Sequence, residues 1–525
     1  MTQENTINQF LSARKVSTPI IAIETPDQGA TFKGLLKVLG TARVYGWDAV
    51  QGLRICAGIE EDEHEAEWEV LLASCHGEHM ATMNPTIALS CVRNIRLDSC
   101  VVMFNIQRHY DDPGVAQAIW NLRDLYKAHG KTLVLLVPEC RLPNELRHDV
   151  VVLREPLPES KELAPMVENL VVRAKDSCPD FPDLDSKTLD AVTSSLAGLS
   201  MQQAEQVAAM SLRKTGIDLS TLRTNQRRQV EQTPGLSIVQ SDSLFSNLHG
   251  MDSLVGFLEC VIKGKRKPKT FVFVDEIEKA FAGAFGLGDS SGTSQEQHGY
   301  ILQHMQDTNA RGIILVGGPG TGKSELAKAS GNEGDCWTVQ LDLGGMKGSL
   351  VGESGAMTRR ALDVVDALGQ GECFWIATCN SIESLPPELR RRFSYGTWYV
   401  EQPNEESRAN MWHQYRKRFD CIDDSKPAYA IANSLASEYE GWTGAEIRTC
   451  CSMSADLGIS IWEASKYISP VYRSNAESIA RIEQLAAGRF LSARNGGLYK
   501  NTKVAVPDGL INQVTGERII SMDES

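Results

Sequence analysis

A glycine-rich stretch, "GGPGTGKS" at 317–324, has the composition and spacing of a phosphate-binding loop. It follows the apolar run "GIILVG" and opens the helical pattern "SELAKAS", so a strand, a loop and a helix are expected in succession. Glycines let backbone N–H groups surround phosphate oxygens, and a helix N-terminus favours the negative charge. Lys323 would bridge the outer phosphates of a nucleotide, and Ser324 would ligate Mg²⁺. The expected binding residues are Gly317, Gly318, Pro319, Gly320, Thr321, Gly322, Lys323 and Ser324.

A second stretch, "FVFVDEIEKAF" at 271–281, is an apolar run that ends in Asp275 and Glu276. A carboxylate at the carboxyl end of a strand can hold Mg²⁺, and the next one can activate a water molecule as a general base. A strand that merely ends in solvated acids is the alternative, and the phosphate loop in the same chain argues against it. In the usual order the phosphate loop comes first, whereas here the acidic strand precedes it.

Two further stretches carry side chains that could act on a phosphoryl group. "CFWIATCN" (373–380) indicates a buried strand ending in Asn380, whose amide could orient the attacking water. "ELRRRF" (388–393) supplies Arg391 and Arg392, and guanidinium groups can stabilise charge on a transferring phosphoryl group. The alternatives are a turn asparagine and a solvated basic face.

The whole chain has the composition of a protein with several globular domains. It has 525 residues, 42% hydrophobic and 23% charged, with a net charge of −14. We expect no membrane span and no secretory signal at the N-terminus, because neither a long apolar run nor a basic and then apolar start is present. The 13 cysteines form no C-x-x-C pair, which favours a reduced, cytoplasmic setting. The negative charge argues against extensive wrapping of nucleic acid.

Apolar runs alternate with helical stretches twice along the chain, which is typical of an α/β fold with parallel sheets. Helical patterns are expected at 114–130, at 185–230 and from 405 to 490, with a linker at 224–235. The expected strands are 19–24, 100–106, 132–137 and 149–155 in the first part, and 270–274, 312–316, 337–343, 373–378 and 397–401 in the second.

A weak internal repeat links the two parts, and we interpret it as an old duplication. "LPNELR" at 142–147 parallels "LPPELR" at 385–390, and "LAGLSMQQAE" at 196–205 parallels "YEGWTGAEI" at 439–447. The predicted organisation is a first α/β domain, a helical segment with a linker, a nucleotide-binding core, a helical lid and a loosely packed tail. The corresponding residues are 1–180, 181–235, 236–402, 403–490 and 491–525.

Together these motifs resemble those of the AAA+ ATPases over roughly residues 235–465. "DEIEKAFAG", "LVGES" and "LPPELRRRF" are most similar to the Ycf-type AAA-domain proteins, named for a hypothetical chloroplast reading frame. "DDPGVAQAIWNLRDLYKAHGKTLVLLVP" extends the similarity into the first half. The resemblance implies ATP and Mg²⁺ as ligands, an arginine finger acting across subunits, and a homo-oligomer with a hexameric ring as the default. It also implies an adenosine contact at Gly444 and Ala445 in "GWTGAEI".

The chain departs from the family in three respects. The acidic strand and the helical stretch at 294–307 have moved ahead of the phosphate loop, so the expected fold is an AAA+ parallel sheet with rearranged connectivity. Each strand can keep its slot in the family order 5-1-4-3-2, although exchange of the moved unit between subunits is an alternative. Leu350 stands where the family's pore loop often has an aromatic residue, and this departure argues against threading of a polypeptide. The first domain lacks the phosphate loop and has Asn105 in place of an acid, so it is expected to be a degenerate, AAA-like relative.

Two functions follow as hypotheses. The first is an ATP hydrolase whose ring remodels or disassembles a macromolecular partner. The second is an ATP-dependent assembly switch or scaffold with slow turnover. DNA is one candidate partner for it, bound through the basic run "KGKRKPK" at 263–269. A solvated linker is the simpler interpretation of that run, so nucleic acid is not favoured. The sequence does not name the substrate or the pathway.

Overall fold

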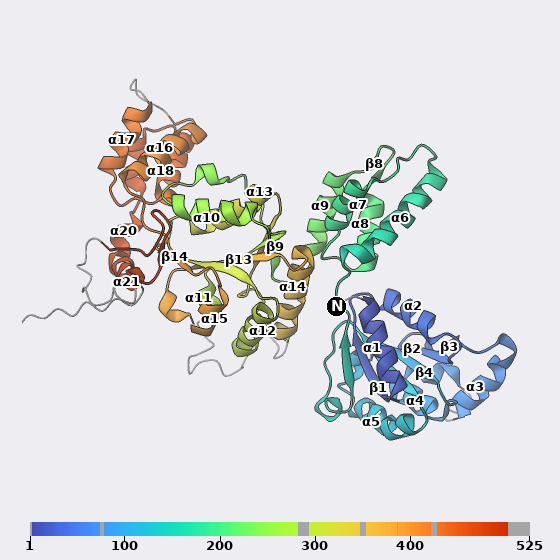
Figure 1. Ribbon diagram of the computed structural model, residues 1–525. Coiled ribbons are helices and arrows are strands. Elements are labelled where there is room, and N and C mark those ends of the chain that lie inside the picture. Colours follow the sequence, from blue (N-terminus) through green and yellow to red (C-terminus); the bar gives the residue numbers. More distant parts are fainter. Residues whose placement is uncertain are drawn as a thin grey trace, which may run out of the picture. The chain divides into compact units, whose positions relative to one another are not determined.

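The computed structural model describes residues 3–73, 78–281, 293–346, 353–385, 387–421 and 428–501. The chain forms two compact units, Met1–Gln229 and Val230–Ser525 (Figure 1). Leu350 of the expected pore loop lies outside the described residues. Within the described ranges, no helix is long and apolar enough to cross a lipid bilayer.

The first unit is built on a six-stranded sheet in the order β3-β2-β4-β5-β1-β6. Its strands pair in parallel except for β3, which runs antiparallel to β2. Every residue of β5 is buried, as expected for a parallel strand covered on both faces. The strands are β1 (Ile20–Glu24), β2 (Val44–Asp48), β3 (Gly52–Ala57), β4 (Cys100–Phe104), β5 (Thr132–Val137) and β6 (Val151–Arg154).

Helices cover both faces of this sheet because alternate residues of each strand point to opposite sides. On one face, Ile21 and Val134 pack with Phe10 of α1 (Gln3–Lys15) and Leu35 of α2 (Gln28–Leu39). On the other face, Ile20 and Leu133 pack with residues of α4 and α5. The helices on that side are α3 (His64–Leu72), α4 (Pro85–Cys91) and α5 (Pro113–Ala128).

A helical group completes the first unit. It consists of α6 (Ser160–Ser177), α7 (Ser186–Ser194), α8 (Met201–Met210) and α9 (Leu219–Val230), with the hairpin β7 (Leu212–Arg213) and β8 (Gly216–Ile217). The linker expected at 224–235 was wrong for its first half, because α9 continues to Val230. Leu222, Gln226 and Val230 recur at helical spacing and are buried, while polar residues fill the exposed face. Gln226 Nε2 also donates a hydrogen bond to Ala197 O at 2.8 Å.

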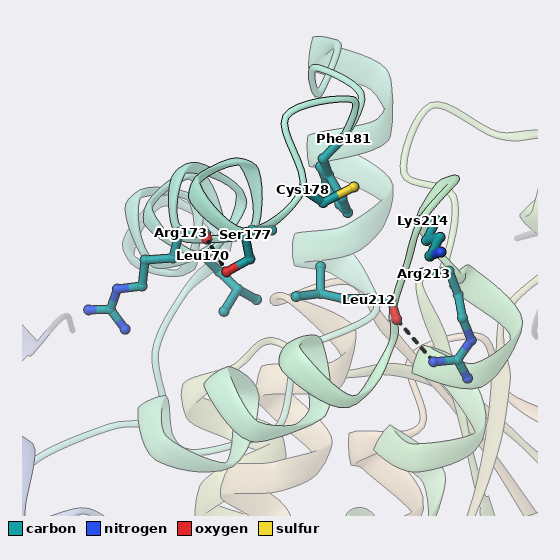
Figure 2. A pocket seen from close by; sticks show the side chains of 9 residues that line it. Leu170, Arg173, Ser177, Cys178, Phe181, Leu212, Arg213 and Lys214 are labelled. Atoms are coloured by element: carbon teal, nitrogen blue, oxygen red, sulfur yellow. Dashed lines mark hydrogen bonds between the residues drawn. The ribbon is translucent and has the colours of Figure 1, made fainter.

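A shallow hollow of about 370 Å³ lies between the end of α6, the turn that follows it and the β7–β8 hairpin (Figure 2). Leu170, Phe181 and Leu212 form its apolar lining. Arg173 extends away from the hollow in Figure 2 and forms an ion pair with Glu205 at 3.4 Å. The hollow is therefore mainly apolar and open.

The second unit contains a seven-stranded sheet in the order β15-β14-β11-β13-β10-β12-β9. β10, which ends at the acidic pair, pairs in parallel with β13 on one side and with β12 on the other. The strand order therefore agrees with the 5-1-4-3-2 order expected for this sheet. The strands are β9 (Leu236–Ile238), β10 (Thr270–Val274), β11 (Arg311–Val316), β12 (Trp337–Leu341), β13 (Cys373–Cys379), β14 (Thr397–Tyr399) and β15 (Leu491–Ser492).

The two sheets have corresponding strands in the same spatial order. β6, β1, β5, β4 and β2 of the first sheet correspond to β14, β11, β13, β10 and β12 of the second, and an antiparallel edge strand follows in each. Among the five corresponding parallel strands, the order along the chain differs at one. β4 comes after β1 and β2, whereas its counterpart β10 comes before β11 and β12.

Helices also cover both faces of the second sheet (Figure 1). Leu254 and Leu258 of α10 (Asp252–Lys263) and Leu326 of α13 (Lys323–Gly334) pack on Phe271 and Phe273. The opposite face carries α11 (Ile277–Phe281), α12 (Thr293–Asp307), α14 (Glu353–Gly369) and α15 (Pro387–Arg392). This arrangement leaves the carboxyl ends of the parallel strands at one edge, where ligands bind in open α/β sheets.

A C-terminal helical group has its own core around Trp412, Leu435 and Ile447. It contains α16 (Glu405–Phe419), α17 (Ala428–Glu438), α18 (Gly444–Leu457) and α19 (Ile461–Ala464), followed by α20 (Val471–Ser474) and α21 (Ala476–Ala486). The loose tail expected from 491 was wrong for its first part. β15 joins the sheet beside β14, and the buried Ala493 donates its N–H to Tyr399 O at 3.0 Å. Residues 502–525 lie outside the described ranges.

Candidate nucleotide site

The glycine-rich loop joins the carboxyl end of β11 to the first turn of α13. Gly320 and Gly322 have φ values of 79° and 92°, a region that favours glycine. A Cβ on Gly317 would lie 2.5 Å from Val400 O, so this position admits only glycine without movement of the backbone. Thr321 Oγ1 donates to Gly318 O at 2.9 Å and holds the loop in its turn. The loop therefore has the backbone cradle that a phosphate group needs.

Lys323 is 6% exposed and points back into the loop. Its Nζ donates hydrogen bonds of 2.8 Å to Gly317 O and to Gly318 O. Burial lowers the pKa of Lys323 to about 8, while Glu278 and the acidic pair act in the opposite direction. The ammonium is thus held inside the loop, and its pKa lies closer to neutral pH than that of a solvated lysine.

Asp275 connects three elements at the edge of the sheet. Its Oδ1 accepts hydrogen bonds from Ser324 Oγ at 3.1 Å and from Thr378 Oγ1. These residues come from the end of β10, the first turn of α13 and β13. The exposed carboxylate and the hydroxyl of Ser324 form a set of oxygen donors of the kind that Mg²⁺ prefers. The two residues named from the sequence as magnesium ligands therefore meet, and they fit the ion.

Glu276 follows in a left-handed backbone conformation, with φ 46°. Its N–H donates to Thr378 Oγ1 at 2.9 Å. Its carboxylate accepts Asn380 Nδ2 at 3.1 Å through Oε1, and Lys279 Nζ at 2.5 Å through Oε2. The predicted base and the predicted water-orienting amide are thus in direct contact.

Two residues of this site were missed in the sequence. Thr378 lies in β13 two positions before Asn380, which directly follows the strand, so the two-residue period of a strand is the signal that could have placed Thr378 beside the acids. Glu278 is 8% exposed, and its Oε1 accepts the backbone N–H of Asn380 at 2.9 Å. The acidic spacing in "DEIE" was the available signal for Glu278.

The C-terminal helical group contacts the phosphate loop through the start of α18. A Cβ on Gly320 would lie 2.5 Å from Thr443 Oγ1 and 3.3 Å from Ala445 Cβ. Thr443 caps α18 in a capping box with Glu446, which fixes the first turn containing Gly444. The structure therefore brings Gly444 and Ala445 beside the loop.

The arginines of α15 lie elsewhere. Arg391 is exposed, whereas Arg392 is half-buried and donates from Nη2 to Gln306 Oε1 of α12 at 2.8 Å. Arg392 is therefore engaged within its own chain. Arg391 is the more accessible of the two for a group outside it.

The corresponding edge of the first unit has different chemistry. Asn105 has φ 56° directly after β4, and its Oδ1 accepts Gln28 Nε2 at 2.8 Å. Asp27 lies in the loop after β1, where its Oδ1 accepts Ala30 N–H at 3.0 Å and its Oδ2 accepts Gln202 N–H of α8 at 3.1 Å. Asp27 and Gln28 thus take the place that the glycine loop has in the second unit, and Asn105 takes the place of the acidic pair.

A glycine loop between a strand and a helix, with an acidic pair and an asparagine directly after neighbouring parallel strands, is typical of P-loop nucleotide-binding proteins. Comparison with known proteins agrees with this class. Residues 3–154 match the family described as SpoVK-like AAA ATPase, N-terminal domain.

The chain is also similar to curated proteins that carry the name "Uncharacterized AAA domain-containing protein ycf46". The one from Guillardia theta is 22% identical over 539 residues, covering 92% of this chain and 95% of the relative. The one from Trieres chinensis is 22% identical over 495 residues, covering 84% and 86%. A proteasome-activating nucleotidase from Sulfurisphaera tokodaii is 27% identical over 203 residues, covering 30% and 50%. These similarities support the AAA ATPase family and assign no biological role.

Proposed function

We propose that this protein is an AAA-type ATPase that hydrolyses Mg-ATP and uses the cycle to remodel or disassemble a macromolecular partner. The observation that carries the proposal is the hydrogen-bond network from Ser324 through Asp275 and Thr378 to Glu276 and Asn380. It joins a phosphate loop, an oxygen ligand set and a general base at one edge of one sheet.

In this proposal the backbone of 317–324 and the ammonium of Lys323 bind the phosphates of ATP, and Gly444 with Ala445 contacts the adenosine. Ser324 and Asp275 hold Mg²⁺, which neutralises charge on the phosphates. Glu276 accepts the proton of the attacking water, and Asn380 orients that water.

The unusual chain order is explained by relocation of the β10–α12 segment ahead of β11. The first sheet supports this explanation, because it has the same spatial order with the strands in the ordinary sequence. The Ser324–Asp275 hydrogen bond within one chain favours a site completed in cis over one completed by exchange between subunits. The first unit is then a degenerate copy that no longer binds a nucleotide.

The second candidate is an ATP-dependent switch that turns over slowly, with DNA as one possible partner. Its support is the exposed basic run at 263–269. Part of that charge is already paired, since Lys263 contacts Glu259 at 2.8 Å and Arg266 contacts Glu372 at 3.2 Å. We therefore favour a protein partner, and we retain a cytoplasmic location from the cysteine content.

The test is ATP turnover together with oligomer size by light scattering, for the wild type, Glu276→Gln and Lys323→Ala. We expect turnover by the wild type, loss of at least about 100-fold in Glu276→Gln with ATP still bound, and loss of ATP binding in Lys323→Ala. ATP should increase the oligomer size of the wild type and of Glu276→Gln. Equal turnover by Glu276→Gln and the wild type would contradict the proposed base.

The ring and its arginine finger need a separate experiment. Arg391→Ala should bind ATP normally and hydrolyse it slowly, because the arginine acts on the site of the neighbouring subunit. Mixing Arg391→Ala with Lys323→Ala should restore activity, since each variant supplies the group that the other lacks. Arg392→Ala is the matched control. If activity does not recover on mixing, Arg391 does not act on the site of the neighbouring subunit.

A further inference from the structure

Glu278 is a buried acidic side chain at the centre of the site, and the roles described so far do not use it. It lies one position beyond Ile277 in α11, and 8% of its surface is exposed. Acidic side chains are almost never buried unless they are paired, because removing a carboxylate from water is costly. Its position therefore requires a reason.

Its two oxygens have different surroundings. Oε1 accepts the backbone N–H of Asn380 at 2.9 Å. Oε2 is buried and makes no regular hydrogen bond. Burial is the main cause that raises the pKa of the Cys379 thiol, and the negative charge of the Glu278 carboxylate is the next. The same carboxylate also acts on the Lys323 ammonium. Glu278 thus lies between the phosphate loop and the end of β13.

The bond to Asn380 restrains the backbone at the point where β13 ends. β13 ends at Cys379, so Asn380 leaves the regular pairing of the sheet. The backbone N–H of Asn380 donates a hydrogen bond to Glu278, and its side-chain amide donates one of 3.1 Å to Glu276. A shift of about 1 Å in such a group can cost about 100-fold in rate. Glu276, which directly precedes the short helix α11, therefore holds the side chain of Asn380, and Glu278 within that helix holds its backbone.

We propose that Glu278 is a positioning residue, which holds the Asn380 backbone so that its amide meets the general base Glu276. The inference rests on the proposed ATPase function. It requires the oxygen of Glu278 as an acceptor and does not require its charge. A buried acid that only packs α11 against β13 would support stability in the same way and would leave the geometry of Asn380 unchanged.

The test compares Glu278→Ala, Glu278→Gln and the control Glu401→Ala. Glu401 is also a buried acid of the second unit, with one oxygen bonded to Ser492 and the other without a hydrogen-bond partner. Glu278→Ala should lower kcat about tenfold or more with KM for ATP within about threefold. Glu278→Gln should stay within about threefold of the wild type, because its amide oxygen still accepts the N–H. Glu401→Ala should lower the Tm and leave kcat unchanged.

Hydrogen–deuterium exchange of the Asn380 amide gives a second readout that needs no turnover. It should speed up in Glu278→Ala and remain slow in Glu278→Gln. Equal impairment of Glu278→Gln and Glu278→Ala would overturn the acceptor role in favour of the charge. A fall in kcat that only follows the Tm would overturn positioning. Wild-type protein that fails to hydrolyse ATP refutes the proposed function, and the exchange of Asn380 still decides whether Glu278 holds it.

Discussion

The side-chain amide of Asn380 donates a hydrogen bond of 3.1 Å to the carboxylate of Glu276, across 104 positions in the chain. Two residues earlier, within β13, Thr378 accepts the N–H of Glu276 and donates to Asp275. The end of β13 and the residue that follows it therefore present two polar side chains to the acids that follow β10. The left-handed backbone of Glu276 is costly for a residue other than glycine, and these contacts offset that cost.

Replacing Thr378 by valine should weaken this arrangement while keeping the shape of the side chain. Both hydrogen bonds of its hydroxyl are lost, and the partly buried N–H of Glu276 is left without its acceptor, which costs about 1 kcal/mol. We expect a lower Tm, a weaker response to Mg²⁺ and a lower kcat. Magnesium titration of ATP turnover and thermal unfolding measure these effects.

Thr338→Val is the matched control, because Thr338 is a buried threonine of β12 whose hydroxyl bonds to Ala327 O at 3.4 Å, away from the acidic pair. It should lower the Tm and leave the magnesium response unchanged. An unchanged magnesium response in Thr378→Val would show that the hydroxyl does not orient Asp275.

Five strands of the second sheet, β10 to β14, were predictable because each is a short apolar run, and both faces of a parallel sheet are buried. The short strands β9 and β15 at its two edges were not predicted. β2 and β3 were missed since "VYGWD" and "GLRICA" mix apolar residues with glycine and charge. The second half of α9 was read as part of a linker because its sequence is mostly polar. Its buried face depends on Leu222 and Val230, which are visible only once the helix is known.

The chemistry of the site was predictable where a motif fixes the spacing, as for Lys323 and Asp275. Which strands lie beside β10 depends on the whole sheet, and sequence order alone suggests the wrong neighbours. The spacing in "DEIE" draws attention to Glu278 but does not predict its burial, because an acid on a short helix is normally solvated and its burial comes from the end of β13. The binding and catalytic roles assigned to these residues stay predictions.

Gly320→Ala should impair nucleotide binding through the contact with α18. The added Cβ would lie 2.5 Å from Thr443 Oγ1, in a backbone conformation with φ 79° that is already unfavourable for alanine. We expect weaker ATP binding and a loss of stability of about 1–2 kcal/mol. Fluorescence titration with an ATP analogue and thermal unfolding measure both quantities.

Gly371→Ala separates the contact from the backbone strain. Gly371 has φ 77°, and an added Cβ would meet nothing within 4 Å. It should lose a similar amount of stability while binding ATP like the wild type. If both variants bind equally well, the loop tolerates the displacement of Thr443 and the contact has no role in binding.

ATP affinity should fall as the pH rises above about 8. Burial lowers the pKa of Lys323 to about 8, against the opposing influence of Cys379, Glu278, Asp275 and Glu276, so the free protein loses the ammonium proton there. Bound phosphates favour the charged lysine, so binding then takes up a proton and weakens by up to about tenfold per pH unit. Calorimetry in buffers of different ionisation enthalpy detects that proton. Lys323→Arg keeps its charge and should show no such dependence, and a flat wild-type profile would contradict the lowered pKa.

In the first unit, Asp27 lies where the second unit has its phosphate loop, and its carboxylate connects α2 to α8. Its Oδ1 caps α2 through Ala30 N–H, and its Oδ2 accepts Gln202 N–H in the first turn of α8. Asp27→Ala should remove both bonds, and the lost cap costs about 1 kcal/mol. Asp27→Asn keeps an oxygen for the cap and cannot accept the second N–H, so it isolates the connection to α8.

Hydrogen–deuterium exchange at Gln202 distinguishes these cases. Exchange should increase in both variants, whereas α2 should lose protection only in Asp27→Ala. ATP turnover should change by less than about twofold in either, because the site of the second unit contains none of these groups. If ATP protects Gln202 in Asp27→Asn, then the first unit binds the nucleotide after all, and the carboxylate of Asp27 normally excludes it.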